Sequence, residues 1–338
     1  MKRTRRRCFN DLTKMGLTIA ALVIVGCVYS FGIKSPIRNA TTFTLARGAS
    51  VSSVAASLYA DGLISSPDAF KFAVRMHGGK IQSGRYDIPR RTSVWRMAHM
   101  FATGDVAATV VVIPEGLTIK QIKQLLLTQS DLSGGVECGA GRSDAVCDLH
   151  DGDIFPDSYR VATGTSRLAV LELARKKMSG IEDAWARAGR IMPPVLRSWN
   201  DVVTLASIVQ KETPRESEMP IVASVYLNRL HKNMRLQADP TVVYALTNGL
   251  GDMQGAALLR GHLRVDSPYN TYTHGGLPPA PIANVGQAAI RAVLRPADTN
   301  YLYFVADGRG GHKFANSYDE HIRNHADWRA IKKLRNGQ

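Results

Sequence analysis

Residues 15–33, MGLTIAALVIVGCVYSFGI, form an uncharged run near the start of the chain. At a rise of about 1.5 Å per residue, a helix of this length is just long enough to cross the hydrocarbon core of a bilayer. The preceding residues 1–14 hold six basic side chains and one acidic side chain. Because basic flanks stay in the cytoplasm, we expect a cytoplasmic tail at 1–14, one transmembrane helix at 15–33, and the remainder outside the cytoplasm.

Two other interpretations of this run compete with a retained anchor. A cleaved signal peptide usually has a shorter apolar region and a small-residue cleavage site, and none is obvious here. Residues 24–27, IVGC, loosely resemble a lipoprotein cleavage box, but apolar sequence continues past the cysteine. The sequence therefore favours a single-pass membrane protein.

The charge of the chain indicates the kind of partner it meets. The 338 residues carry a formal net charge of +15 with 45% hydrophobic residues, which is typical of a globular protein with an anionic partner. An exported domain rarely meets nucleic acid, so we predict no nucleic-acid partner. An acidic membrane surface or an acidic polymer fits better. The length predicts two or three domains.

Two of the four cysteines, Cys138 and Cys147, lie in the glycine-rich stretch GGVECGAGRSDAVC. In an oxidising compartment, a local disulfide that closes this loop is plausible. A zinc site is disfavoured, because only His150 is near and no CxxC pair exists. We therefore predict a structural disulfide.

The N-terminal half contains three segments that align with one another: FTLARGASVSSVAASL (43–58), YDIPRRTSVWRMAHMF (86–101) and VVIPEGLTIKQIKQLL (111–126). Each segment predicts a short strand, a turn and a helix. A hydroxyl residue that suits a helix N-cap stands before each helix: Ser50, Ser93 and Thr118. Repeated strand–helix units are therefore expected over 40–128.

The first of these units adds a second helix over SPDAFKFAVRMHG, with Ser66 as its cap and Pro67 at its first position. A strand–helix–helix unit of this kind resembles the LysM type of glycan-binding module. A generic α+β scaffold is the alternative.

The pattern of predicted helices and strands changes after a predicted linker loop at 129–151. From residue 152 to 338 we expect a mixed α+β domain, so the fold class as a whole is α+β. Its helical patterns cover 166–188, 199–212, 219–232 and 284–295, followed by a basic amphipathic helix at the C-terminus. The turn DGRGG between 301–305 and 312–315 predicts a β-hairpin.

Templates for cofactor and metal chemistry are missing from the sequence. We find no GxSxG elbow, Walker A loop or GxGxxG after a strand. His321 and His325 are spaced i, i+4, but the glutamate of an HExxH motif is missing, so we interpret them as a solvent-facing pair. We predict no metal and no cofactor.

One acid stands where an apolar residue is expected. In LASIVQKETPRE (205–216), Leu205, Ile208, Val209 and Glu212 share one helix face. A buried, unpaired carboxylate is costly, so Glu212 must be protonated or paired. An acid with a raised proton affinity suits general acid–base catalysis near neutral pH, and a structural ion pair is the alternative.

Two further stretches carry polar groups that suit a binding site. Asp239 precedes Pro240 and is a candidate site residue, although an N-cap of the helix that begins with Pro240 is a strong alternative. The loop SPYNTYTHGGLPPAPIANVG (267–286) combines tyrosine rings with amides, as sugar-binding loops do. An ordinary proline-rich surface loop is the alternative.

Taken together, seven stretches in order resemble the membrane-anchored endolytic murein transglycosylases, the MltG or YceG-like family. They are EGLTIKQI (115–122), FPDSYRV (155–161), ASIVQKE (206–212), ASVYLNRL (223–230), MRLQADPTVVYAL (234–246), YNTYTHGGLPPAPI (269–282) and YLYFVADGRGGHKF (301–314). In that family the catalytic acid closes the ASI-[IV]-[EQ]-[KR]-E stretch, which here is Glu212. This sequence has Gln210 where many members carry a first glutamate, which leaves one titrating acid in the motif.

The resemblance implies a lytic transglycosylase that cleaves the MurNAc-β-1,4-GlcNAc bond of nascent peptidoglycan strands and leaves 1,6-anhydroMurNAc ends. A hydrolase needs two carboxylates, whereas a lytic enzyme can use the 6-hydroxyl of the sugar as nucleophile and one carboxyl twice. Six residues would then position the glycan: Asn228, Gln237, Asp239, Tyr269, Asn270 and Tyr272.

The resemblance also implies a location and partners. The enzyme would be tethered to the inner membrane with its catalytic domain in the periplasm, and it would terminate glycan elongation beside peptidoglycan synthases. Two other functions stay open. One is a non-catalytic, membrane-tethered glycan-binding scaffold, and the other is a muramidase with a second acid facing Glu212.

Overall fold

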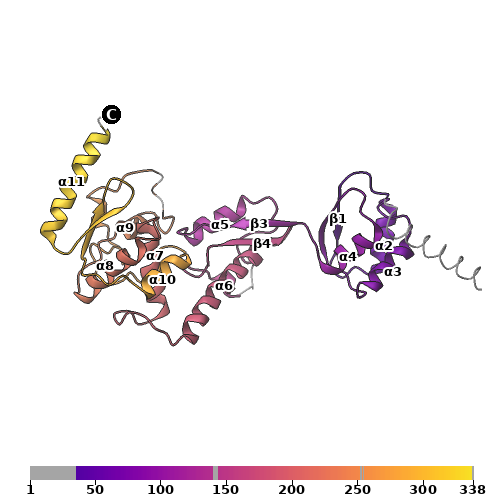
Figure 1. The fold of residues 1–338 in the computed structure, drawn as a ribbon, viewed down its shortest axis with the longest axis horizontal. Helices are drawn as coiled ribbons and strands as arrows, with labels where there is room; N and C mark the ends of the chain where they lie inside the picture. The colour runs from indigo at the N-terminus through magenta and orange to yellow at the C-terminus, as the bar shows by residue number, and fades with distance from the viewer. Residues whose placement is uncertain (1–35, 140–143, 252, 254, 337–338) are drawn as a thin grey trace, which may run out of the picture. The chain divides into compact units, whose positions relative to one another are not determined.

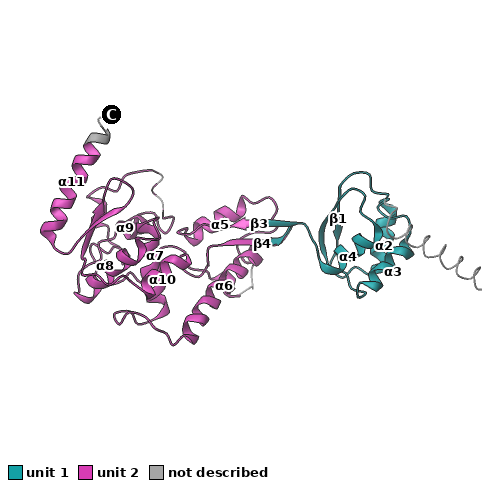
Figure 2. Cartoon of the chain, in the orientation of Figure 1, with its two compact units in different colours: residues 1–109, 160–164 teal, residues 110–159, 165–338 magenta. Residues whose placement is uncertain are grey.

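The computed structural model describes residues 36–139, 144–251, 253 and 255–336. The chain forms two compact units, unit 1 with residues 1–109 and 160–164 and unit 2 with residues 110–159 and 165–338 (Figure 2). Helices and small two-stranded sheets make up both units, so the predicted α+β class is confirmed. The predicted span at 15–33 lies outside the described residues. No helix in the described part of the chain is both long and apolar enough to cross a membrane.

Unit 1 is a small strand–helix assembly. It contains β1 (Thr41–Leu45), α2 (Val51–Ala60), α3 (Pro67–Met76), β2 (Gly84–Ile88) and α4 (Val94–Thr103). Strands β1 and β2 pair antiparallel, with Thr41 opposite Ile88. The three helices bury an aromatic core around Phe101, whose ring lies 4.4 Å from that of Tyr86 and 5.9 Å from that of Phe70.

The predicted N-caps are all confirmed. Each hydroxyl accepts a hydrogen bond from the backbone N–H three residues later, which satisfies a donor that the helix leaves unpaired. The four pairs are Ser50 with Ser53, Ser66 with Ala69, Ser93 with Arg96 and Thr118 with Gln121.

Strands β3 (Ala108–Val112) and β4 (Ser158–Ala162) form a second sheet and pass through the boundary between the units. Unit 2 then contains α5 (Ile119–Leu127), η2 (Ala145–Cys147), α6 (Arg167–Arg187), α7 (Trp199–Glu212), α8 (Met219–His231), α9 (Asp239–Leu246), η3 (His262–Arg264), α10 (Gln287–Leu294), β5 (Tyr303–Ala306), β6 (His312–Ala315) and α11 (Tyr318–Asn336). Strands β5 and β6 form the predicted hairpin. The predicted disulfide between Cys138 and Cys147 is also present.

Helix α7 is the central element of unit 2 (Figure 1). Residues 202–209 are all buried, and α8, α9 and α10 pack around the helix. The helix ends at Glu212 because Thr213 precedes Pro214, and the residue before a proline is disfavoured in the helical conformation. Thr213 is extended, with φ −139° and ψ 133°. The apolar stripe therefore continues to Glu212, the last residue of the helix.

A buried asparagine ties three segments of unit 2 together. Asn284 is fully buried, and its side-chain oxygen accepts hydrogen bonds from the N–H groups of Gly152 and Ile154, both at 3.0 Å. Its side-chain nitrogen donates to the carbonyl of Leu117 at 3.0 Å. The loop before α5, the loop before β4 and the loop before α10 are therefore joined through one amide.

Candidate active site

Glu212 lines a cavity of about 290 Å³ in unit 2. Parts of α7, α8, α9, β5 and α11 form its wall together with the 236–237 and 272 segments. The lining residues are Glu212, Tyr226, Arg229, Leu236, Gln237, Asp239, Tyr272, Phe304, Val305, His321 and His325. Glu212, Gln237, Asp239 and Tyr272, all named from the sequence, therefore come together in one cavity. We call it the Glu212 cavity.

Glu212 holds its proton at neutral pH. Burial is the largest cause and the negative charge of Asp239 a smaller one, and together they raise its pKa to about 8 against a hydrogen bond from Tyr226 and the charge of Arg229, which act in the opposite direction. The oxygen Oε2 is buried and makes no hydrogen bond to any described residue. Because a desolvated carboxylate is costly, the neutral acid is the favoured form. The site therefore presents one proton donor.

Two polar residues of α8, Tyr226 and Arg229, line the cavity beside this acid. Tyr226 is buried, and burial raises its pKa well above the usual value, so it stays a neutral hydroxyl. The guanidinium of Arg229 donates to the carbonyl oxygens of Leu302 and Leu236, both at 2.7 Å. It also lies 5.3 Å from the centre of the Tyr303 ring. Arg229 thus connects α8 to two other walls of the cavity.

Asp239 does not cap α9, so that alternative is wrong. The N-cap position is taken by Ala238, which makes no side-chain cap, and Asp239 is the first residue of the helix. Its Oδ1 accepts a hydrogen bond of 2.5 Å from the hydroxyl of Tyr272. Burial and this bond raise the pKa of Tyr272 well above its usual value. The pair presents a carboxylate and a hydroxyl beside Glu212.

Gln237 reaches the cavity from a strained backbone. Its φ is 48°, in the left-handed region that side chains rarely adopt. The backbone holds this conformation because the N–H of Gln237 donates to the carbonyl of Thr271, and the N–H of Ala238 donates to the Thr271 hydroxyl. Such strain is often found at functional sites.

The histidines of α11 line the cavity, so their interpretation as a solvent-facing pair is wrong. The His321 ring stacks on Tyr303 at 5.3 Å, and its Nδ1 is buried without a hydrogen-bond partner among the described residues. Burial lowers the pKa of both His321 and His325, which favours neutral imidazoles. The sequence pattern did not indicate these histidines as site residues, nor Tyr226 and Arg229, although the latter two lie i, i+3 in the mostly apolar helix α8.

The other three predicted residues lie outside the cavity lining. The amide of Asn228 donates to the carbonyls of Thr299 and Tyr301, at 2.8 and 3.0 Å. The amide of Asn270, fully buried, donates to the carbonyls of Leu263 and Val265, at 3.1 and 2.8 Å. Both amides therefore hold loop backbone in place. Their contact with glycan stays a prediction.

Tyr269 lies in a different cavity of unit 2, with its ring centre 4.8 Å from that of Tyr244. Gln210 is also used structurally, because its side-chain oxygen accepts a hydrogen bond from the N–H of Gly286, the N-cap of α10. In the part of the chain that the structure describes, no three His, Cys, Asp or Glu side chains are grouped to hold a metal ion.

These observations define an α+β protein with one protonated carboxylic acid at the end of a buried helix, beside a carboxylate, a hydroxyl and neutral imidazoles. Such a site can protonate a leaving group. The model of the YceG-like family matches residues 43–327, so the chain belongs to the YceG-like family.

Relatives with assigned names cover most of the chain. The endolytic murein transglycosylase of Bacillus subtilis (strain 168) is 27% identical over 329 residues, which cover 88% of this chain and 89% of that protein. The protein of the same name in Streptococcus pneumoniae serotype 2 (strain D39) is 24% identical, over 85% of this chain and 58% of that protein. The crystal structure of a YceG-like protein from Listeria monocytogenes matches with a TM-score of 0.50 and 26% identity, over 84% of this chain and 98% of that one.

Proposed function

We propose that this chain is an endolytic peptidoglycan lytic transglycosylase, which cleaves the MurNAc-β-1,4-GlcNAc bond of glycan strands and forms 1,6-anhydroMurNAc ends. The observation that carries the proposal is the protonated Glu212 at the wall of a cavity. The names of the relatives from Bacillus and Streptococcus support the substrate class.

In the proposed reaction Glu212 acts twice. Its carboxyl proton passes to the glycosidic oxygen as the bond between that oxygen and C1 of MurNAc breaks. The 6-hydroxyl of the same sugar then attacks C1, and the Glu212 carboxylate takes the hydroxyl proton. One C–O bond forms for the one that breaks, and no water is consumed. The carboxylate of Asp239, which lines the same cavity, would stabilise the positive charge that develops at C1.

The remaining predicted residues would act as binding groups. Gln237, Asp239 and Tyr272 line the Glu212 cavity and would contact the sugars next to the scissile bond. Asn228 and Asn270 would act on the glycan through the loops that they hold.

We infer the following organisation for the whole chain. Residues 15–33 would anchor it in the inner membrane with residues 1–14 in the cytoplasm, and a linker at 129–151 would precede the periplasmic catalytic domain at 152–338. The order β1, α2, α3, β2 supports a LysM-like glycan-binding unit within 40–128. An enzyme held at this place would end growing strands beside peptidoglycan synthases.

Product analysis tests the proposed reaction. Murein glycan digested by the full chain should yield anhydro ends, which are lighter than hydrated ends by one water and are resolved by mass spectrometry. Hydrated ends alone would contradict the proposal. The absence of any product would favour the non-catalytic scaffold.

A two-carboxylate muramidase is the second candidate, because Asp239 lines the same cavity as Glu212. A hydrolase needs Asp239 as a base or nucleophile, and the change Asp239→Asn should then abolish cleavage. In a lytic enzyme the same variant should keep making anhydro ends.

The pH profile gives a further prediction. Because only the neutral acid donates a proton, the activity should fall as the pH rises through the Glu212 pKa of about 8. Asp239→Asn removes a negative charge that raises this pKa, so the alkaline limb of kcat should move to lower pH. The exposed Glu216→Gln is the matched control and should leave the limb in place. A limb that does not move in Asp239→Asn would show that this charge does not act on the acid.

A further inference from the structure

A second cavity in unit 2, of about 490 Å³, takes no part in the proposed reaction. We call it the tyrosine cavity. It lies between the start of α5, the second half of α9 and two stretches of the 267–282 loop. Its lining includes Lys120, Asp151, Tyr244, Ser267, Tyr269 and Ala280.

Two tyrosine rings dominate its wall. The ring centres of Tyr244 and Tyr269 lie 4.8 Å apart, with the planes tilted by 47°. The hydroxyl of Tyr244 donates to Oδ2 of Asp151 at 2.6 Å, and Oδ1 of the same carboxylate accepts from the N–H of Ile119 at 2.5 Å. Both oxygens of Asp151 therefore accept hydrogen bonds from the protein itself, and the hydrogen bond from Tyr244 fixes the orientation of that ring. Fixed aromatic faces with a few polar groups around them suit a ring-shaped ligand such as a sugar.

The tyrosine cavity lies close to the Glu212 cavity along the chain. Tyr269 lines the first and Tyr272 the second, and three residues of extended chain span at most about 11 Å. Helix α9 lines both cavities, with Asp239 in one and Tyr244 in the other, five residues apart, or about 7.5 Å along the helix axis and about 140° around it. A few linked sugars can cover this distance.

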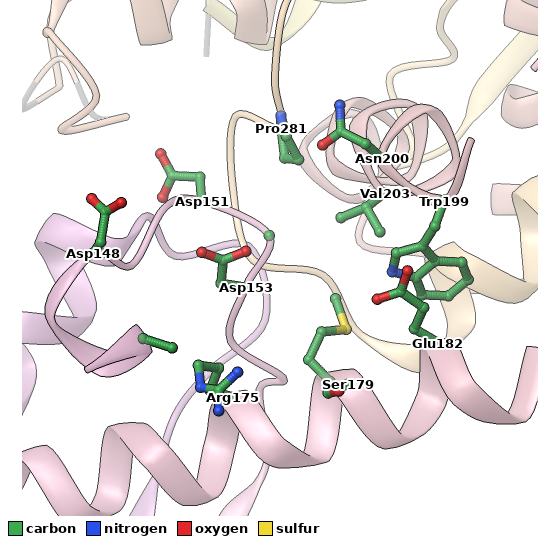
Figure 3. Close-up of a pocket in the computed structure, with 13 residues that line it drawn as sticks. Asp148, Asp151, Asp153, Arg175, Ser179, Glu182, Trp199, Asn200, Val203 and Pro281 are labelled. Carbon is green, nitrogen blue, oxygen red and sulfur yellow. The ribbon is translucent and has the colours of Figure 1, made fainter. Parts of the chain in front are cut away.

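The cavity on the other side of Asp151 and Pro281 has the opposite character. Figure 3 shows Asp148, Asp153 and Glu182 around it, with Arg175 among them. A strand that carries carboxylates would be repelled there. The tyrosine cavity instead has Lys120 in its wall, with its ammonium 2.5 Å from the carbonyl oxygen of Asn248. The charges thus favour the tyrosine cavity for an anionic glycan.

We propose that the tyrosine cavity is a second glycan subsite, which binds an N-acetylated sugar of the same strand whose scissile bond lies beside Glu212. This inference rests on the proposed function. The sugar ring stacks on Tyr244 and Tyr269, and the Ser267 hydroxyl in the cavity wall hydrogen-bonds to its polar groups. Binding energy gained away from the reacting bond positions the strand for cleavage, so long strands are better substrates than short ones.

The test compares strands of two lengths, both stripped of stem peptides, with the full-length chain. Ala280→Trp fills the cavity without removing any contact of the tyrosines. It should lower kcat/KM for long strands about tenfold, the equivalent of about 1.4 kcal/mol, and for tetrasaccharides by no more than about twofold. Tyr269→Ala should show the same dependence on length. Leu246→Gln, at an exposed position of α9 outside the cavity lining, is the matched control and should change neither value.

Binding in the Glu212→Gln background separates the subsite from the proposed reaction, because it needs no turnover. Calorimetry with long stripped strands should show weaker binding when Ala280→Trp is added. Equal losses for long and short strands, unchanged binding, or an effect seen only with strands that keep their stem peptides would each overturn the subsite. A wild-type chain that binds long strands through this cavity but forms no product would instead overturn the proposed reaction.

Discussion

Glu212→Gln should lower the rate at which anhydro ends form, with a loss of about 10²–10⁴-fold in kcat. Glutamine keeps the shape of the side chain but has no proton to give to the glycosidic oxygen. The measurement is the initial rate of anhydro-end formation from purified glycan at pH 6, where Glu212 with a pKa of about 8 is protonated. Gln210→Glu is the control variant. It should keep forming anhydro ends, because residue 210 lies outside the lining of the Glu212 cavity. Full activity in Glu212→Gln would refute the assignment of the acid.

The same variant should be more stable than the wild-type chain at alkaline pH. In the unfolded chain the carboxyl loses its proton above its ordinary pKa of 4.5, whereas in the folded chain it keeps the proton up to a pKa of about 8. The stability that Glu212 contributes is therefore complete below pH 4.5 and is lost between these two values as the pH rises. Glutamine does not titrate, so the melting temperature of Glu212→Gln relative to wild type should rise by a few degrees from pH 4.5 to pH 8. A difference that does not depend on pH would contradict the raised pKa.

Asn284→Leu should give the second large effect, a loss of about 3 kcal/mol or more in the free energy of unfolding. Leucine fills a similar volume but leaves the N–H groups of Gly152 and Ile154 buried without their acceptor, and the carbonyl of Leu117 loses one donor. Each unsatisfied buried group costs about 1–3 kcal/mol. Urea denaturation measures the change.

The matched control for this prediction is Asn300→Leu, an asparagine at an exposed position. It should change the free energy of unfolding by no more than about 0.5 kcal/mol. A loss below about 1 kcal/mol in Asn284→Leu would mean that the three loops stay joined without the amide.

Local signals explain why much of the fold could be predicted from the sequence. Ser50, Ser66, Ser93 and Thr118 each act on a backbone N–H three residues away, so the code for the helix starts is contained in a few neighbouring positions. The end of α7 is equally local, because Thr213 precedes Pro214 and is therefore disfavoured in the helical conformation. The periodic placement of apolar residues likewise predicted the helices α7 and α8 and the hairpin of β5 and β6.

Contacts between distant segments could not be predicted in the same way. Strand β4 pairs with β3 although α5 and the disulfide loop separate the two strands in the sequence, and no local signal links them. His321 reaches the Glu212 cavity from α11, about a hundred residues after the acid. The sequence DP fits a helix cap at Asp239, but Ala238 holds the N-cap position and the Asp239 carboxylate accepts a hydrogen bond from Tyr272 instead.

The placement of Arg229 limits how this site can change during evolution. One guanidinium both fastens the walls around the acid and opposes the rise of the Glu212 pKa, so a substitution there disturbs the fold and the proton affinity together. Asp239 carries its charge at the start of a helix and makes no cap. A change of proton affinity through residue 229 therefore comes with a loss of contacts between the cavity walls, whereas a change through residue 239 comes with the loss of a carboxylate that the proposed reaction uses.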